Sequence, residues 1–259
     1  MTRVICVLNF KGGTGKTTTA VNLGMALALR GCRVLAIDFD PQGSLTTWLG
    51  VSDERTLADV LLQKAEWSDC VTRARVRFDV IPANQRLVEA EYNLLERQVP
   101  TEVLARRLSG ISQGGYDYVL MDCAPSVSLL SECAVFAADK VLVPVSMEYL
   151  ALLGAKKVII EVLRARRLTE QRSAQLSLIV PSFYDERHVK SRETMTMLNR
   201  WFPGLVTHPI RASVRLSEAP SHRRTIAEYD PDGPASQDFA RVAEEVMDRD
   251  GRLTTDEQS

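Results

Sequence analysis

Residues 11–18 of this 259-residue chain read Lys-Gly-Gly-Thr-Gly-Lys-Thr-Thr, and they constrain the fold more than any other feature. They follow a short apolar run, residues 4–8, and lead into residues 17–29, which have the composition of a buried helix. Strand, glycine loop and helix are the setting of a phosphate-binding loop, in which a Gly is followed four residues later by Gly-Lys-Ser/Thr. Phe10 stands where that first Gly belongs, and Lys11 is an additional lysine. The run therefore predicts a phosphate site of unusual form.

The residues of this loop suit a nucleotide phosphate chain bound with Mg²⁺. Glycines let successive backbone N–H groups surround phosphate oxygens, and the helix start adds the positive end of its dipole. Lys16 is expected to reach the β- and γ-phosphates, and the Thr17 hydroxyl to ligate Mg²⁺. The expected nucleotide-binding residues are Lys11, Gly12, Gly13, Thr14, Gly15, Lys16, Thr17 and Thr18.

Other interpretations of the loop have less support. A glycine-rich turn without a ligand does not explain why strand, loop, Lys-Thr pair and helix coincide. A dinucleotide-binding turn needs a third Gly where Thr18 stands. Three roles stay open for Lys11: to neutralise charge on the leaving group, to contact a nucleotide held by another subunit, or to remain a solvated surface lysine.

Three aspartates follow two further apolar runs. Asp38 ends the first run, and Pro41 disfavours a strand that continues to Asp40. Asp38 then suits Mg²⁺ coordination, usually through water, whereas Asp40 in the loop is placed to position an attacking water. Asp122 ends the second run, where nucleotide-binding strands present a carboxylate to Mg²⁺. For Asp38 and Asp40, solvated acids at a strand-to-turn transition are the alternative.

Strand-like runs alternate with helical patterns, which predicts an α/β fold of the P-loop NTPase kind: a mostly parallel twisted sheet with helices on both faces. The expected strands lie near residues 3–9, 33–38, 77–82, 117–122, 140–145, 176–181 and 206–210. Ligands of such sheets bind beyond the carboxyl ends of the strands, where the loop and the acids fall. Residues 235–249 have the pattern of an amphipathic helix. We expect one ATPase domain, residues 1–250, and a polar, disordered tail, residues 251–259.

Three segments together resemble the ParA/MinD family of deviant Walker-A ATPases. The family's marks are a KGGxGKTT loop, a DxDPQG segment and a strand ending in D-x-P-P/A-S, which stand here at Lys11–Thr18, Asp38–Gly43 and Asp122–Ser126. Residues 211–222, RASVRLSEAPSH, are similar to a stretch of the ParA/Soj branch, whose members partition plasmids and chromosomes. The similarity spans residues 1–50, 78–150 and 178–248.

The resemblance implies roles for single residues at the nucleotide site. Lys11 matches the signature lysine that crosses a dimer to the partner's nucleotide, and Lys16 and Thr17 match phosphate and Mg²⁺ residues. Asp40 matches the residue assigned to hydrolysis, and Asp122 a second acid beside the metal. The catalytic residues expected on this basis are Lys11, Lys16 and Asp40, and the metal residues are Thr17, Asp38 and Asp122.

The resemblance also implies nonspecific binding of double-stranded DNA by the ATP-bound dimer. Arg187 and Arg215 match the arginines used for it, and Arg223, where Gly is usual, adds charge together with Arg224. The chain has a net charge of −1, but residues 151–224 hold 14 Lys/Arg against 6 Asp/Glu, a balance of +8. Such a block attracts a phosphate backbone although the whole chain is nearly neutral, whereas solvated helix faces are the alternative for any one residue. The block also contains Arg164, Arg166, Arg167, Lys190 and Arg192.

The function expected from these features is that of a Mg²⁺-dependent ATPase of ParA type, which converts ATP and water to ADP and phosphate. It would form a nucleotide-sandwich homodimer, bind DNA in that state, and segregate chromosome or plasmid DNA with a ParB-like activating protein. No leader pattern precedes the first strand, so we expect a cytoplasmic, nucleoid-associated protein.

Related ATPases define the alternatives. A positioning ATPase for a chemotaxis array, flagellum or microcompartment would use the same site and stays open. Metal-delivery ATPases need paired cysteines, and the five cysteines here form no CxxC pair. MinD-like ATPases end in a basic amphipathic helix, whereas residues 248–259 are acidic, so no membrane partner is expected. A scaffold without turnover is disfavoured because Lys16, Asp40 and Asp122 are all present.

Overall fold

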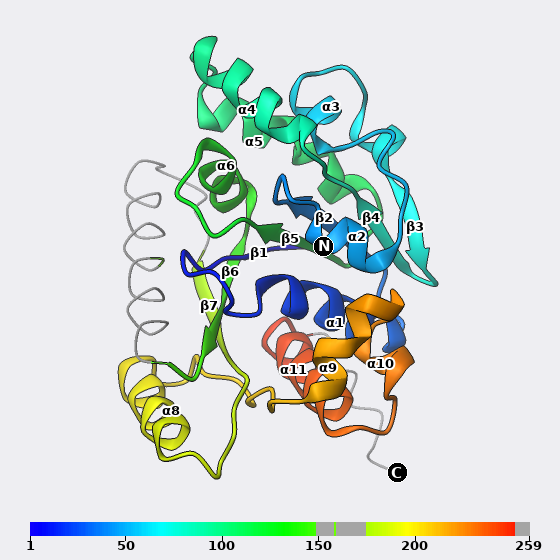
Figure 1. Cartoon of the computed structure of the whole chain (residues 1–259). Helices are drawn as coiled ribbons and strands as arrows, with labels where there is room; N and C mark the ends of the chain where they lie inside the picture. The colour runs from blue at the N-terminus through cyan, green and yellow to red at the C-terminus, as the bar shows by residue number, and fades with distance from the viewer. Residues whose placement is uncertain (149–157, 159–174, 252–259) are drawn as a thin grey trace.

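One seven-stranded sheet organises the chain, with strand order β3-β4-β2-β5-β1-β6-β7 (Figure 1). The computed structural model describes residues 1–148, 158 and 175–251. Neighbouring strands pair in parallel except β3 and β4, which are antiparallel, so the predicted mostly parallel α/β sheet is confirmed. The strands are β1 (Arg3–Val7), β2 (Val34–Phe39), β3 (Thr72–Arg75), β4 (Phe78–Ile81), β5 (Tyr118–Cys123), β6 (Lys140–Ser146) and β7 (Gln175–Ser182).

Helices cover both faces of this sheet (Figure 1). The α-helices are α1 (Lys16–Leu29), α2 (Ser44–Leu49), α3 (Leu57–Leu61), α4 (Arg86–Glu96), α5 (Thr101–Arg107), α6 (Leu129–Ala137), α8 (Val189–Trp201), α9 (Val214–Glu218), α10 (Ile226–Tyr229) and α11 (Pro234–Arg249). Short 3₁₀ turns are η1 (Trp67–Cys70), η2 (Ser109–Gln113) and η3 (Ala219–His222). Helices α3 to α6 pack on one face, and α1, α2, α10 and α11 pack on the other.

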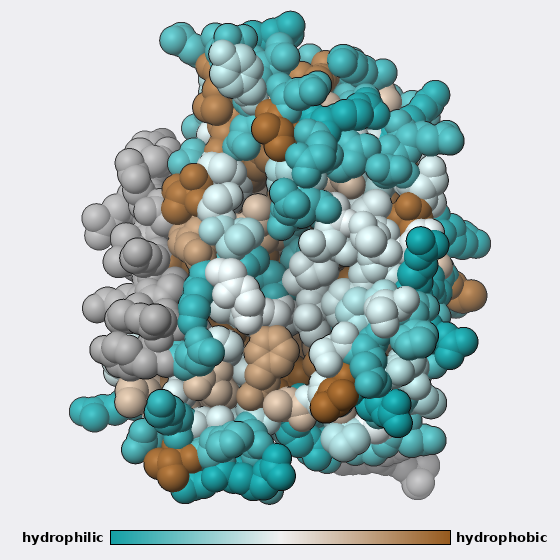
Figure 2. Space-filling model, in the orientation of Figure 1, coloured by the Kyte–Doolittle hydropathy of each residue, from teal (hydrophilic) through white to brown (hydrophobic). Residues whose placement is uncertain are grey.

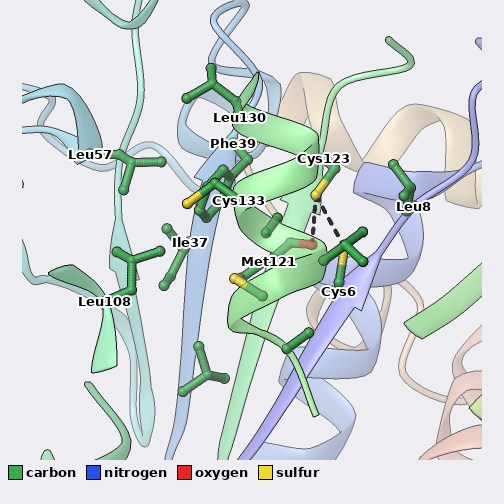
Figure 3. Packing of buried hydrophobic residues seen from close by; sticks show 14 of the residues in the cluster. Cys6, Leu8, Ile37, Phe39, Leu57, Leu108, Met121, Cys123, Leu130 and Cys133 are labelled. Atoms are coloured by element: carbon green, nitrogen blue, oxygen red, sulfur yellow. Dashed lines mark hydrogen bonds between the residues drawn. The ribbon is translucent and has the colours of Figure 1, made fainter. Parts of the chain in front are cut away.

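Side chains alternate between two cores because successive residues of a strand point to opposite faces. In β1, Ile5 and Val7 join the core beneath α1, whereas Cys6 joins the core beneath α6. Figure 3 shows this second core, in which the Sγ atoms of Cys6 and Cys123 are 3.4 Å apart. None of the five cysteines forms a disulfide, and all five are buried, as small hydrophobic side chains are.

One predicted strand, residues 206–210, is wrong, and one observed strand, β3, was not predicted. In residues 206–210 only an isolated bridge from Val206 to Ile179 forms, because Pro209 lacks the N–H that a ladder needs. The edge strand β3 has two arginines among its four residues, so it carries no apolar signal. It pairs with β4 through backbone hydrogen bonds that composition does not reveal.

The predicted C-terminal helix is confirmed as α11, which buries Phe239, Val242 and Val246 on one face. After it, Gly251 adopts a left-handed φ of 64°, and residues 252–259 of the expected tail lie outside the described part of the chain.

The face drawn in Figure 2 is mainly hydrophilic, with small, separate hydrophobic groups. Exposed apolar side chains of α4 include Val88, Tyr92 and Leu95. Among the described residues, no helix is both long and apolar enough to cross a lipid bilayer.

Candidate nucleotide site and basic surface

The loop between β1 and α1 has the backbone shape that its glycines allow. Gly13 and Gly15 have φ values of 72° and 88°, a left-handed region that other residues rarely adopt. Gly15 also caps α1, which begins at Lys16 without a side-chain cap, so its first N–H groups are available to an anion. A Cβ at Gly15 would lie 3.4 Å from Ser182 Oγ, so the end of β7 forms one wall of the loop.

Lys16 is buried at the first position of α1, with 7% of its surface exposed. Its Nζ donates a hydrogen bond to the Lys11 carbonyl oxygen at 3.1 Å, which uses one of the three ammonium donors. Burial lowers the pKa of Lys16, whereas the nearby carboxylates of Asp122 and Asp40 oppose that change. The ammonium group is therefore pre-positioned between the loop and the acids.

Lys11 is held at the outer side of the loop. Its backbone N–H donates to Asn9 Oδ1 at 3.1 Å, and Asn9 Nδ2 in turn donates to the Pro144 carbonyl at 2.8 Å. The side-chain ammonium forms an ion pair with the exposed carboxylate of Glu148, whose pKa it lowers. In a single copy of the chain, Lys11 thus contacts its own Glu148, at an edge where its side chain is 28% exposed.

Asp38 and Asp122 are register partners on the adjacent parallel strands β2 and β5. Both side chains point to the α1 face, because they continue the alternation of Ala36 and Leu120 in the core beneath α1. Their exposed fractions are 0% and 1%. The fold therefore brings two of the predicted metal residues together at the carboxyl ends of the strands.

Asp38 is fully engaged with the loop that follows β2. Its Oδ2 accepts hydrogen bonds from the Thr46 hydroxyl at 2.7 Å and the Thr46 N–H at 3.0 Å, and its Oδ1 accepts from the Asp40 N–H at 3.1 Å. Burial raises the pKa of Asp38 to about 6, although these hydrogen bonds oppose the rise. Through its hydrogen bonds with Thr46, Asp38 holds the start of α2.

Asp122 is the unsatisfied member of the pair. Its two carboxylate oxygens are buried and have no hydrogen-bond partner among the described residues. Burial and the neighbouring Asp38 raise the pKa of Asp122, whereas Thr17 and Lys16 lie close enough to oppose that rise. A buried carboxylate without partners is costly and needs a proton or a cation.

These groups fit a nucleotide with Mg²⁺. Carboxylate and hydroxyl oxygens are the ligands that Mg²⁺ prefers, and Asp122 and Thr17 supply them beside the glycine loop. The residues that would hold the ion are Thr17 and Asp122, with Asp38 next to Asp122 on the neighbouring strand. Once bound, Mg²⁺ would offset the charge of the phosphate oxygens.

Asp40 lies outside the strand, because β2 ends at Phe39, as the following proline predicted. Its Oδ1 accepts from the Gln42 N–H at 2.9 Å, and its carbonyl oxygen accepts from the Gly43 N–H at 2.9 Å. The carboxylate is therefore held in a turn and not in the sheet. The separate positions that the sequence indicated for Asp38 and Asp40 are confirmed.

The predicted DNA-binding arginines lie in exposed segments that follow β7 in the chain. Arg187 follows β7, with an 84% exposed side chain that binds both oxygens of Asp185. Arg215 lies in α9, with a 62% exposed side chain beside Glu218. A backbone bridge between Tyr184 and Arg211 joins the two segments.

Arg223 and Arg224 are exposed at the end of η3, and Arg223 has a left-handed φ of 52°. This conformation explains why Gly is compatible with the position. The other arginines of the predicted basic block, Arg164, Arg166 and Arg167, lie outside the described residues.

Four residues of the site escaped the sequence reasoning: Asn9, Thr46, Glu148 and Ser182. Asn9 is a polar residue directly after a buried strand, which is a signal that could have been used. Thr46 lies close to Asp38 along the chain but has no motif of its own, whereas Glu148 and Ser182 come from distant segments that only the tertiary fold brings to the loop.

Comparison with known proteins agrees with this geometry. A family model described as an AAA domain matches residues 2–175. The sporulation initiation inhibitor protein Soj of Bacillus subtilis is 36% identical over 253 residues, covering 95% of this chain and 98% of Soj. The chromosome partitioning protein ParA of Caulobacter vibrioides is 38% identical over 254 residues, covering 96% of this chain and 95% of ParA.

Among solved structures, a cobyrinic acid a,c-diamide synthase from Mycobacterium smegmatis with a bound ATP analogue and magnesium has a TM-score of 0.82 and 30% identity. The match covers 97% of this chain and 98% of the synthase chain. Both sequence relatives match nearly the full length of this chain. This chain belongs to the ParA/Soj family of chromosome-partitioning P-loop ATPases.

Proposed function

We propose that this protein hydrolyses ATP with Mg²⁺, dimerises around two nucleotides, and binds double-stranded DNA nonspecifically in that dimer. A ParB-like protein would stimulate hydrolysis and release the DNA. The protein would then act on the nucleoid to segregate chromosomal or plasmid DNA.

The observation that carries the proposal is the buried carboxylate of Asp122, which has no hydrogen-bond partner in the described part of the chain and lies near Thr17 and Lys16. It supports a bound cation, and the open N–H groups at the start of α1 support a phosphate next to it. The relative of known structure with an ATP analogue and magnesium adds support for this pair of ligands.

The chain's own residues have distinct tasks in this proposal. Lys16 donates to the transferred phosphoryl group, and the loop amides hold the remaining phosphates. Asp40, fixed by its turn, orients the water that attacks in line with the leaving oxygen. Lys11, at the exposed edge of the loop, exchanges Glu148 for the nucleotide of a second copy.

ATP turnover tests the nucleotide part. Phosphate release by the full chain should require Mg²⁺, and Lys16→Ala should abolish it. Asp40→Ala should retain ATP binding and accumulate an ATP-bound dimer in size-exclusion chromatography. Normal hydrolysis by Asp40→Ala would remove that residue from the mechanism.

A gel-shift titration with random duplex DNA tests the DNA part. The shift should need MgATP and should be absent with MgADP. Failure of the wild-type protein to bind DNA with MgATP at modest salt would refute this part and leave the ATPase assignment in place. Adding a ParB-like protein to the ATPase assay tests the activating partner.

A further inference from the structure

Helix α2 links the hydrolytic loop to the basic surface. It has only six residues, Ser44–Leu49, and a helix of that length spans about 9 Å. Its first residue follows the Asp40–Gly43 turn, and its last residues face the segment 223–226. A rigid element this short carries a displacement from one end to the other.

The near end of α2 is fixed to the nucleotide site. Thr46 donates its hydroxyl and backbone N–H to Asp38, and its hydroxyl oxygen accepts from the Ala83 N–H at 3.0 Å. A rotation of α2 therefore changes the hydrogen bonds that Asp38 accepts from Thr46. The same carboxylate accepts a hydrogen bond from the Asp40 N–H, so the rotation also affects the position of Asp40.

The far end of α2 is fixed to the basic surface by two side chains. Trp48, 6% exposed, donates its indole N–H to the Arg224 carbonyl at 2.8 Å. Arg75 of β3 donates to the Leu49 carbonyl at 3.4 Å and to the Arg223 carbonyl at 2.7 Å, and it forms an ion pair with Glu228. We call these contacts of Trp48 and Arg75 the α2 tether.

The same segment is also anchored to α1. The Ile226 N–H donates to Asn22 Oδ1 at 2.7 Å, and Asn22 Nδ2 donates to the Thr18 carbonyl at 2.8 Å. Residues 223–226 thus lie against both elements that carry the nucleotide site. Arg223 and the Pro41–Gly43 turn line one pocket, so they lie close together in space.

The side chains of Arg223 and Arg224 face solvent, whereas their backbone carbonyl oxygens contact the α2 tether. The side chains are positively charged, and the carbonyl oxygens accept the hydrogen bonds of the tether. A phosphate backbone that pulls on the side chains would therefore move or stiffen the acceptors of Trp48 and Arg75.

We propose that Trp48 is a positioning residue for hydrolysis, which transmits DNA binding at Arg223 and Arg224 through α2 to the Asp40 turn. The inference rests on the proposed DNA-binding function. Trp48 touches neither nucleotide nor DNA in this scheme, and Arg75 acts in parallel with it.

The variant Trp48→Phe tests the role of the indole N–H, because it removes the donor and keeps an aromatic ring in the core. Trp201→Phe on α8 is the matched control, since Trp201 lies away from α2 and has no part in the tether. For each protein, the affinity for random duplex DNA with MgATP is measured, together with kcat and KM for ATP with and without saturating DNA.

The expected result is a selective loss of coupling. Trp48→Phe should keep its DNA affinity and its DNA-free kcat and KM within about twofold, whereas the ratio of kcat with DNA to kcat without DNA should move toward one, by about two- to tenfold for one lost hydrogen bond. Trp201→Phe should keep the wild-type ratio. Arg75→Lys, which keeps the charge but loses the forked donors, should show the same selective loss and replaces Trp48→Phe if that variant does not fold.

A fluorescence measurement gives a readout that does not depend on turnover. With Trp67→Phe and Trp201→Phe, Trp48 is the remaining tryptophan of the three in the chain. Adding DNA to the MgATP form should shift its emission. An unchanged kcat ratio in Trp48→Phe, an equal loss of kcat with and without DNA, or no emission shift would each overturn the proposal. If wild-type protein fails to bind DNA at all, the proposed DNA function falls first, and the direct binding assay identifies that case.

Discussion

Asp38 and Asp122 lie side by side as buried register partners on β2 and β5, yet among the described residues only Asp38 has donors within hydrogen-bond geometry. Burial raises the pKa of both carboxyl groups, and the neighbouring Asp38 raises the pKa of Asp122 further. The pair therefore destabilises the free protein and favours any cation that reaches Asp122. The carboxylate of Asp122 is therefore expected to lower the stability of the free protein and to raise its affinity for a cation.

Asp122→Asn should stabilise the protein and inactivate it. The neutral amide removes the repulsion with Asp38, so we expect the free energy of unfolding to rise by about 1–3 kcal/mol and the melting temperature by about 2–10 °C. Mg²⁺-dependent phosphate release should fall by at least about a hundredfold. Thermal melts and phosphate assays measure the two effects, with Asp53→Asn on the surface as the control. A lower melting temperature for Asp122→Asn would show that the carboxylate stabilises the free fold instead.

Lys16→Ala and Lys11→Ala should separate nucleotide binding from dimerisation. Lys16 lies between the loop and the acids, so its removal should weaken ATP binding by at least about tenfold. Lys11 contacts only Glu148 by its side chain among the described residues, so Lys11→Ala should keep most ATP affinity and lose the ATP-dependent dimer. Fluorescent-nucleotide titration and light scattering measure these quantities. A Lys11→Ala protein that dimerises normally with ATP would assign this lysine to its own subunit.

The sequence predicted most of the sheet because parallel strands are buried on both faces and carry strong apolar runs. Six of the seven expected strands are present, and Pro41 correctly placed Asp40 outside β2. The edge strand β3 carries Arg73 and Arg75 on a partly exposed surface, so its pairing depends on β4 and not on its own composition.

The sequence also predicted the loop and the three aspartates, since each lies beside its own motif. It did not reveal that Asp38 is occupied by Thr46, nor that Glu148 pairs with Lys11. Thr46 and Glu148 belong to no motif of their own, and Glu148 is also distant from Lys11 along the chain. Only the structure shows that Asp38 accepts hydrogen bonds, whereas Asp122 accepts none from the described residues.

Arg187→Glu and Arg215→Glu should each weaken nonspecific DNA binding while ATP turnover without DNA is retained. Both side chains are exposed, and their ion-pair partners are Asp185 and Glu218, which are not residues of the nucleotide loop, so we expect their loss to remove phosphate contacts alone. The slope of log affinity against log salt should become shallower by about 0.9 for each lost contact. Gel shifts at several salt concentrations measure it, with the exposed Arg200→Glu on α8 as the control. Full DNA affinity in both variants would place the DNA on another surface.

Asp185→Asn should have the opposite effect on DNA. Asp185 holds the guanidinium of Arg187 with two hydrogen bonds, and Arg187 in turn keeps the pKa of that carboxyl well below its usual range. Removing the negative charge frees Arg187 for a phosphate. We expect DNA affinity to rise by about two- to fivefold at low salt, with a smaller gain at high salt because screening weakens both states. An unchanged affinity would mean that Arg187 does not leave Asp185 to contact DNA.

Asp238→Asn should loosen the segment that carries Arg215. Asp238 is fully buried and accepts hydrogen bonds from the Arg211 guanidinium, from the Arg211 N–H at 3.0 Å and from His208. Burial alone would raise the pKa of Asp238, but the Arg211 bonds outweigh it and leave the pKa below its usual value. The variant should lose about 1–3 kcal/mol of unfolding free energy at neutral pH.

The pH dependence of this loss follows from the sign of the shift. An acid whose pKa is lowered in the folded state contributes stability above its unfolded pKa of about 3.9 and loses that contribution as pH falls through the folded value. The gap between wild type and Asp238→Asn should therefore be constant from about pH 5 to 7 and shrink below about pH 4. Urea unfolding at several pH values measures it, and DNA affinity at pH 7 should fall in parallel because Arg211 no longer holds the segment before α9. A gap that stays the same at about pH 3.5 would assign the loss to packing and not to the charge of Asp238.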